Sequence, residues 1–249
     1  LRREILGSLG EADLRHLRRI ARWGRLCEAL GQGNLTRWLL MHHIGHGGYD
    51  RVPGVPRRYT SGVFALGRRR FFDWFDWIVP EAWRFEHNVL HHHNTGTHED
   101  PDLAERIFAP LRRSGLPLPL RYLVVLVIAV SWKVVYYAPN TLLALQRERR
   151  RRHDGAARGP TRFLSLFNPF VRGGAEFWRR CLLPYGTVRC VLLPALFLPL
   201  GSMAALFVLV NSLLAEALTN LHAFLVIGPN HTGDDLYRFG RPHRDHPEY

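Results

Sequence analysis

Histidines gather in one short stretch of the sequence, with a spacing that suits metal binding. Five of the fourteen histidines lie between residues 87 and 98, in the segment EHNVLHHHNTGTH. On an α-helix, His87 and His91 would lie one turn apart on one face, whereas His92 would point about 140° round from His87, toward a second point. Neutral imidazole is the commonest protein ligand for metals such as iron, zinc and copper. The stretch therefore predicts two metal ions or one shared cluster.

A second pair of histidines with the same spacing lies upstream, in the motif HHIGH. His42 and His46 are four residues apart, and the glycines at 45, 47 and 48 are expected to end the helix that carries them. One HxxxH motif is a weak signal, but two such pairs in one chain argue against coincidence. The two pairs indicate a single metal site assembled from separate segments.

The elements that carry these motifs are expected to be helices. Residues 1–30 place apolar side chains at nearly helical spacing among seven arginines, which predicts one or two basic amphipathic helices. Such a helix can lie on a membrane surface or on nucleic acid, or it can simply show a solvated face. Residues 71–83 contain three tryptophans and three phenylalanines, a density typical of a packed core or of a membrane–water interface.

Two long stretches with very few charges predict membrane segments. Only Arg121 and Lys133 are charged between residues 116 and 145, and Glu216 is the only charge between residues 190 and 228. One topology has spans near 120–137 and 195–218, which keeps the histidines on one side of the membrane. It places the arginine-rich region 147–180 on the opposite face, against the usual preference for the cytoplasm.

An alternative topology avoids this conflict. In it, residues 116–145 dip into the membrane and return, and residues 183–221 form a short hairpin. Pro194, Pro199 and Gly201 would break the helix at the turn of that hairpin.

The composition narrows the classes of function. The chain has 34 basic residues and a net charge of +13, which favours an anionic partner such as nucleic acid or an anionic membrane. A nucleic-acid module has no need of long uncharged stretches, so the membrane is favoured. The three cysteines are widely spaced and form neither a disulfide framework nor a zinc-finger pattern. The HExxH motif of zinc hydrolases is absent from the sequence.

The histidine motifs and the apolar segments resemble those of the membrane fatty acid desaturases, which are related to alkane and sterol-type hydroxylases. The matching stretches are HHIGH at 42–46, HNVLHHH at 87–93 and NLHAFLVIGPNHTGDDLYRF at 220–239. The resemblance implies an all-α integral membrane protein with a cytoplasmic histidine-rich helical cap. It also implies two non-haem iron ions, which use molecular oxygen and two electrons to remove two hydrogens from an acyl chain. Side-chain acid–base chemistry cannot break an aliphatic C–H bond, so a redox metal agrees with this function.

The resemblance also suggests which side chains bind the iron ions. By position, it assigns ligands to both histidine motifs and to the end of the last apolar segment: His42, His46, His87, His91, His92 and His222. His43 and His93 are adjacent extras whose roles are open. His231 is a rival of His222 for the same position.

Three further side chains are candidates for supporting these ligands. Asn220 lies two residues before His222 and is expected to assist at that position. Asp100 and Asp102 could accept hydrogen bonds from the ring N–H groups of ligating histidines. The alternative is a solvated acidic loop around Pro101.

Two features depart from the family pattern. The family's third histidine motif, HxxHH, is absent, because only His243 and His246 follow His231. Relatives carry a hydrophobic hairpin before the first motif, whereas here a basic helix and a short apolar run at 38–41 precede it. If the 249 residues are the whole protein, we expect an incomplete iron site and little activity. Two bound irons with desaturase turnover would contradict this expectation.

The expected organisation is a single membrane desaturase-like domain. It comprises a basic N-terminal segment, a cytoplasmic histidine region, a membrane segment, a basic loop, one or more further membrane segments and a shortened C-terminal region, at residues 1–40, 41–115, 116–145, 146–182, 183–228 and 229–249. The expected partners are a fatty acyl lipid, the bilayer and an electron donor protein of the ferredoxin or cytochrome type, but no nucleic acid. The alternatives are a hydroxylase of lipids, alkanes or carotenoids, and a non-catalytic basic membrane-binding protein with incidental histidines.

Overall fold

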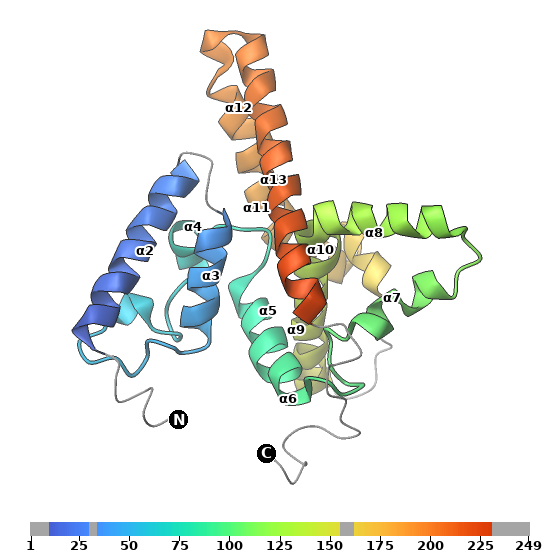
Figure 1. The fold of residues 1–249 in the computed structure, drawn as a ribbon, viewed down its shortest axis with the longest axis horizontal. Coiled ribbons are helices and arrows are strands. Elements are labelled where there is room, and N and C mark those ends of the chain that lie inside the picture. The colour runs from blue at the N-terminus through green and yellow to red at the C-terminus, as the bar shows by residue number, and fades with distance from the viewer. Residues whose placement is uncertain (1–9, 30–33, 155–161, 231–249) are drawn as a thin grey trace. The chain divides into compact units, whose positions relative to one another are not determined.

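The computed structural model describes residues 10–29, 34–154 and 162–230, and every regular element within these ranges is a helix. The predicted all-α class is confirmed. The chain divides into two compact units, Leu1–Asp76 and Trp77–Tyr249, which are described in turn (Figure 1).

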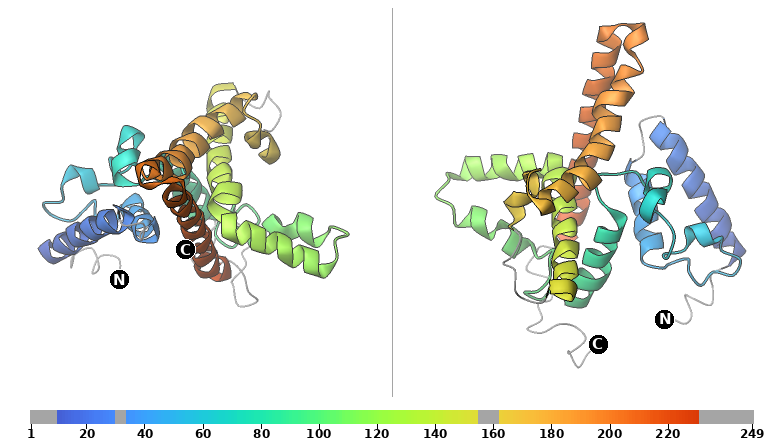
Figure 2. Two further views of the ribbon diagram at one scale, coloured as in Figure 1. Left: turned by 90° about the horizontal axis from the view of Figure 1, so that it is seen from above. Right: turned by 180° about the vertical axis from the view of Figure 1, so that it is seen from behind.

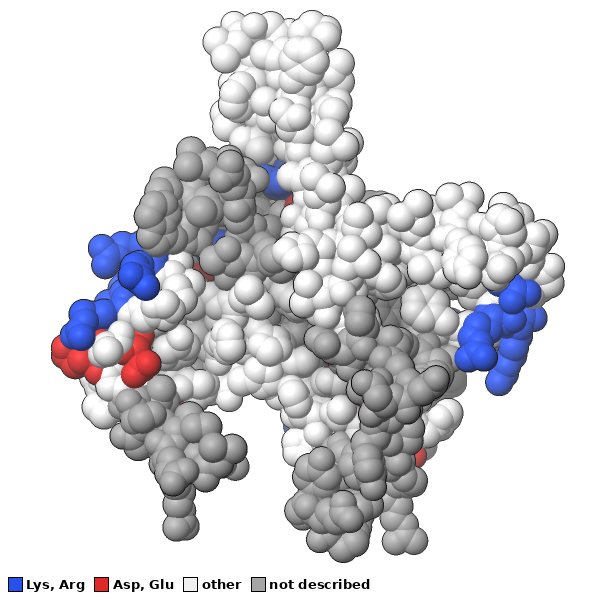
Figure 3. All heavy atoms as spheres, in the orientation of Figure 1, with Lys and Arg blue, Asp and Glu red and all other residues white. Residues whose placement is uncertain are grey.

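The first unit begins with a basic amphipathic helix, α2 (Glu11–Ala29), as the spacing predicts. Leu14 and Leu17 are buried, and α2 packs against α3 (Asn34–Gly45). The arginines of its outer face are exposed: Arg15, Arg18, Arg19 and Arg22. Figure 3 shows basic side chains gathered along this helix. The amphipathic pattern therefore reports a helix that packs on one side and is solvated on the other.

Buried arginines connect α3 to the segment that follows it. Arg37 donates hydrogen bonds to the carbonyl oxygens of Phe72 and Asp73, the latter being the last residue of α4 (Arg70–Asp73). The guanidinium of Arg70 donates to the carbonyl of Asp76 at 2.9 Å. Between them lie two short helical turns, η1 (Arg57–Tyr59) and η2 (Gly67–Arg69). The bonds of Arg37 hold the segment after the first histidine motif to the helix that carries the motif, and the bond of Arg70 lies within that segment.

The second unit is a series of helices interrupted by π-helical turns. Its elements are α5 (Pro80–Phe85), η3 (Glu86–His91), α6 (His92–Asn94), α7 (Ala104–Arg112), α8 (Leu118–Trp132), η4 (Lys133–Tyr137), α9 (Ala138–Asp154), η6 (Phe163–Phe167), α10 (Arg172–Phe177), η7 (Trp178–Leu182), α11 (Leu183–Thr187), η8 (Val188–Leu192), α12 (Leu193–Ala195), η9 (Leu198–Leu200) and α13 (Ser202–Asn230). Of these, η3, η4, η7 and η8 are π-helical. A π-turn accommodates one extra residue within a helix and occurs frequently at functional sites.

Three helical stretches of this unit are long and apolar enough to cross a membrane: Leu118–Arg152, Arg172–Leu200 and Ser202–Gly228. The last two run side by side as a hairpin, and the chain turns at Gly201, whose φ is +111° (Figure 2). The span predicted at 195–218 is therefore wrong, since this turn interrupts it. The hairpin alternative places the break correctly, although the first arm begins earlier, at Arg172.

The surface of the hairpin is apolar, as contact with hydrocarbon requires. Its exposed side chains include large hydrophobic residues on both arms: Leu192, Leu196, Leu200, Met203, Phe207 and Leu214. On the face seen in Figure 3, charged atoms are confined to the base of the hairpin. An apolar surface of this size is rarely exposed to water in a soluble protein, so it is consistent with contact between the hairpin and a bilayer.

One charged cluster lies inside the hairpin. The carboxylate of Glu216 accepts hydrogen bonds from the Tyr185 hydroxyl at 2.6 Å and from the Trp77 indole N–H at 3.0 Å. Nε of Arg189 lies 3.7 Å from the same carboxylate. Charged groups at membrane depth are costly unless they are paired, and here both charges have partners on neighbouring elements.

A π-turn also shapes the first long apolar helix. The N–H of Ala138 donates to the carbonyl of Lys133, five residues before it, and α8 and α9 run in different directions on either side (Figures 1 and 2). The N–H of Lys133 is bonded instead to the side-chain oxygen of Asn220 on α13, at 3.0 Å. A side chain inserted into the backbone ladder is a recognised cause of helix bending. The membrane segment predicted near 120–137 thus lies within a helical stretch that is long and apolar enough to cross a membrane, Leu118–Arg152, and this stretch bends at η4.

Gly174 on α10 gives a sharp test of the packing in this unit. A Cβ at this position would lie 1.9 Å from the carbonyl oxygen of Asn168, an atom of the backbone that cannot swing away. We expect Gly174→Ala to destabilise the protein by about 3 kcal/mol, at the upper end of overpacking effects. Denaturation in detergent measures the change. Gly115→Ala is the matched control, since nothing lies within 4 Å of its Cβ position, and an equal loss in both variants would contradict the packing argument.

Candidate metal centre

The second histidine motif lies on a π-turn, which brings three imidazoles together. The N–H of His92 donates to the carbonyl of His87, five residues before it. The centroid of the His87 ring lies 5.2 Å from that of His91 and 4.7 Å from that of His92. The centroids of the His91 and His92 rings are also 5.2 Å apart. The expectation that His92 points 140° away from His87 is therefore wrong. It assumed α-helical winding, whereas π-winding places residue i+5 above residue i.

An acidic loop orients one of these imidazoles. Nδ1 of His91 lies 2.8 Å from Oδ1 of Asp100, and both side chains are almost fully buried. The same oxygen accepts the backbone N–H of Asp102 at 2.9 Å. A carboxylate that accepts the Nδ1–H of a histidine fixes the tautomer and leaves Nε2 for a metal. Asp100 is buried, so the alternative of a solvated loop does not hold at this residue.

The charges around His91 agree with this arrangement. Burial opposes protonation of the ring, but the hydrogen bond that the ring donates to Asp100 and the charges of Asp100 and Asp102 outweigh it, so the pKa of His91 is raised. Oδ2 of Asp102 lies 4.0 Å from Nδ1 of His91, on the same edge of the ring as Asp100. The acidic side chains therefore favour positive charge at this imidazole, whether from a proton or from a metal on Nε2.

The donor set fits a transition metal. One ligand atom from each of His87, His91 and Asp102 lies within 4.8 Å of the other two, a grouping that could hold a metal ion. His87 is 9% exposed and His91 5%, whereas His92 is exposed. Imidazole with carboxylate is a donor set that suits iron. The second unit thus offers one half-buried cluster of ligand atoms.

Glu86 is a buried carboxyl next to this cluster that sequence reasoning did not assign to the site. Its side chain is fully buried, immediately before His87 on the π-turn. Burial raises the pKa of its carboxyl well above the usual value, and the charges of Asp102 and Asp100 raise it further. The only signal in the sequence is the five-residue spacing between Glu86 and His91. This spacing indicates that the two side chains are neighbours only if the segment is known to be π-helical.

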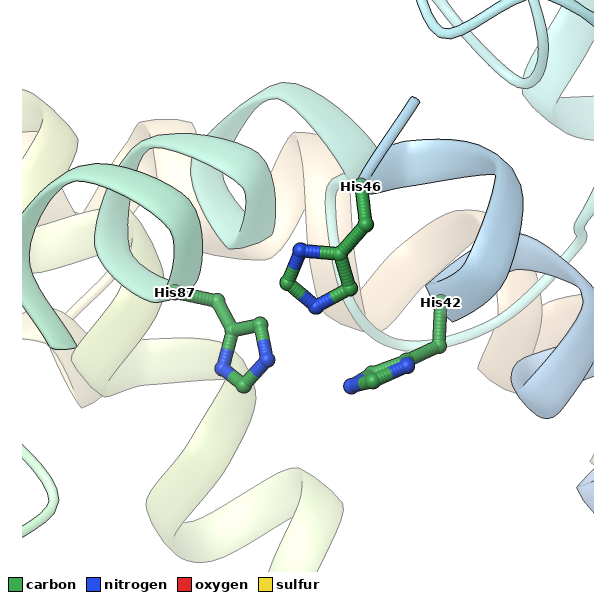
Figure 4. A group of neighbouring side chains, drawn as sticks. All are labelled: His42, His46 and His87. Carbon is green, nitrogen blue, oxygen red and sulfur yellow. The ribbon is translucent and has the colours of Figure 1, made fainter. Parts of the chain in front are cut away.

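The first histidine motif is organised within its own unit. His42 and His46 lie on and just after the last turn of α3, and their ring centroids are 4.6 Å apart (Figure 4). The helix ends at Gly45, as the glycines predict. His43 is exposed, and its ring lies edge-on to the His42 ring with the two centroids 5.8 Å apart. Figure 4 also draws His87, which belongs to the second unit. The i, i+4 pairing of the first motif is thus present as predicted.

The remaining candidates lie elsewhere. His222 is exposed on α13, and in the part of the chain described here it joins no group of three converging ligand atoms. Asn220 is buried, but its side chain bonds the N–H of Lys133 and the carbonyl of Glu216. His93 is exposed beside the cluster. His231 lies outside the described residues. The roles predicted for these side chains stay predictions.

Removing the orienting carboxylate should weaken metal binding without removing a ligand. We expect Asp100→Asn to reduce the affinity for iron(II) by about 10- to 100-fold, as is typical when the partner of a ligating histidine is lost. Competition with a chromogenic chelator measures the affinity. Glu99→Gln is the matched control because Glu99 is exposed in the same loop. Equal affinities for the two variants would show that Asp100 does not orient a ligand.

The fold and the site together define a helical protein with membrane-spanning capacity and histidine clusters that could hold metal ions. The sequence profile of the family described as fatty acid desaturase matches residues 23–247, nearly the whole chain. The chain belongs to the fatty acid desaturase family, a family of membrane oxidoreductases. No curated protein and no solved structure shows significant similarity to it.

Proposed function

We propose that this protein desaturates fatty acyl chains at a di-iron centre held by both histidine motifs. The observation that carries the proposal is the convergence of His87, His91 and His92 on a π-turn, with His91 oriented by Asp100. The paired imidazoles of His42 and His46 support it as a second, preorganised set of donors. Family membership supports the reaction class.

The protein's own residues would bind, orient and shield the metal. When bound, iron would supply the redox chemistry with molecular oxygen that side chains cannot provide. Asp100 holds the Nδ1 proton of His91, so that the ring presents Nε2. The stacked indole of Trp83, 4.6 Å from the His87 ring, shields the other side of the cluster from water. We propose His222 as a further ligand of the centre, with Asn220 and Asp102 in supporting roles.

The setting of this reaction follows from the apolar helices and the family. The substrate in this proposal is an acyl lipid that enters from the bilayer. The histidine motifs lie at the cytoplasmic face, and a separate ferredoxin- or cytochrome-type protein delivers electrons.

Product analysis tests the proposal against hydroxylation, which the same donor set permits. The purified chain would be loaded with iron(II), reconstituted in lipid vesicles with a chemical reductant and dioxygen, and its acyl products separated by mass. Iron that survives dialysis, together with a new double bond, is the expected result. An alcohol would replace our proposal by a lipid, alkane or carotenoid hydroxylase. Failure to retain iron, with vesicle binding that falls steeply with salt, would favour a basic membrane-binding protein.

A further inference from the structure

An unbroken line of aromatic side chains leads away from the histidine cluster. The indole of Trp83 stacks on the His87 ring with centroids 4.6 Å apart and an interplanar angle of 26°. Its N–H donates to the hydroxyl oxygen of Tyr137 at 3.0 Å. The Tyr137 ring stacks on Trp132 with centroids 4.6 Å apart and only 12° between the planes. Each side chain thus contacts the next, over residues drawn from two separate helical runs.

The π-turns create this alignment. Trp132 and Tyr137 are five residues apart across η4, so π-winding places one ring above the other, as it does for His87 and His92 across η3. In an α-helix, residues five apart would diverge by about 140°. Packing explains why these aromatic side chains are buried. Packing alone requires neither parallel ring planes nor an indole–hydroxyl hydrogen bond. Here these features link the side chains into one path that starts at a metal-ligating ring.

We propose that Trp83, Tyr137 and Trp132 form an electron relay that quenches the metal centre when it is strongly oxidised and no acyl chain is bound. The relay rests on the proposed function for its native oxidant, an iron centre oxidised by dioxygen. Tryptophan and tyrosine are among the most easily oxidised side chains, and rings in contact or joined by a hydrogen bond allow electrons to tunnel between them.

The electron balance of the relay is simple. Trp83 loses one electron, and the oxidised centre gains it. Trp132 then re-reduces Trp83 through the Tyr137 hydroxyl, which serves as a bridge and keeps its proton. No bond breaks, and the positive charge ends on Trp132, which is 7% exposed, whereas Trp83 is fully buried. A reductant in solution restores Trp132, and the histidines escape oxidation.

Oxidation mapping in the iron-loaded chain tests the relay. The protein would be exposed to dioxygen with reductant but without substrate, and oxidised residues would be identified by mass spectrometry, with iron content measured in each variant. We expect oxygen addition at Trp132 in the parent, and its loss in Trp83→Phe with new damage at the histidines. Tyr137→Phe removes only the hydroxyl and should have the same effect, which separates the relay from a folding defect. Trp178→Phe is the control, because its indole bonds the carbonyl of Phe167 outside the relay.

The outcomes separate the relay from the metal site. Bound iron with equal Trp132 oxidation in the parent, Trp83→Phe and Tyr137→Phe would overturn the relay and leave the di-iron proposal standing. If no iron binds, the di-iron proposal fails, and a ruthenium photo-oxidant decides the relay. It would be attached through Val89→Cys, an exposed position on η3, with the native cysteines replaced by alanine. An indole radical at Trp132 that requires Trp83 supports the relay, and one that forms equally without Trp83 overturns it.

Discussion

Replacing His91 with alanine is expected to abolish tight iron binding and, with it, desaturation. His91 is the most constrained member of the histidine cluster, because it is buried, bonded to Asp100 and within ring contact of both His87 and His92. Its loss removes a ligand and also leaves the carboxylate of Asp100 buried without its partner. We expect an effect larger than the about 10- to 100-fold loss predicted for Asp100→Asn. Iron content after dialysis is the primary measurement.

His93→Ala provides the comparison for this prediction. His93 directly follows His92 in the sequence but is exposed, and the resemblance to desaturases left its role open. We expect this variant to retain iron at the parent level. Equal iron loss in both variants would show that histidine density, rather than the arrangement on the π-turn, determines binding.

Glu216→Leu is expected to cause the largest loss of stability among single substitutions in the hairpin. It removes the acceptor of both Tyr185 and Trp77 and leaves the Arg189 guanidinium without its counter-charge on an apolar helix pair. Removing one partner of a buried ion pair typically costs about 3–5 kcal/mol. Titration with a denaturing detergent, followed by circular dichroism, measures the change.

A double variant separates loss of charge pairing from loss of packing. Glu216→Leu combined with Arg189→Leu leaves no uncompensated charge, so we expect it to recover part of the stability. Glu148→Gln removes a carboxylate paired with the exposed guanidinium groups of Arg151 and Arg152 on α9 and should leave stability almost unchanged. A double variant less stable than Glu216→Leu alone would show that the cluster acts through its shape and not through its charges.

Local spacing predicted those parts of the fold that depend on local chemistry. The apolar period of residues 11–29 placed Leu14 and Leu17 inside and the arginines outside, and the glycines after Ile44 marked the end of α3. The start of the hairpin could not be predicted in this way. Arg172, Arg179 and Arg180 mark the region as a loop by composition, yet Arg180 is paired with Glu81, which lies 99 residues away in the sequence.

The site was predictable as residue types but not as geometry. The two histidine pairs and the acidic loop follow from the sequence, and the contact of Asp100 with His91 was one of two open readings. The π-winding that gathers His87, His91 and His92 has no local signature. At η4 the same winding is supported by Asn220, whose side-chain oxygen accepts a hydrogen bond from the N–H of Lys133, 87 positions away in the sequence. Interactions over such separations are invisible to periodicity.

The π-turn ties the winding of the histidine cluster to the number of residues in it. A π-turn holds one residue more than an α-helical turn, so deleting Val89 would let the segment rewind as an α-helix with His91 and His92 three and four residues after His87, still on one face. Rewinding the same segment as an α-helix without a deletion would instead turn His92 about 140° away from His87, although no ligand had been substituted. HxxxHH on a π-turn and HxxHH on an α-helix are thus alternative ways to gather the same imidazoles. The number of residues between the ligands belongs to the site as much as the imidazoles themselves.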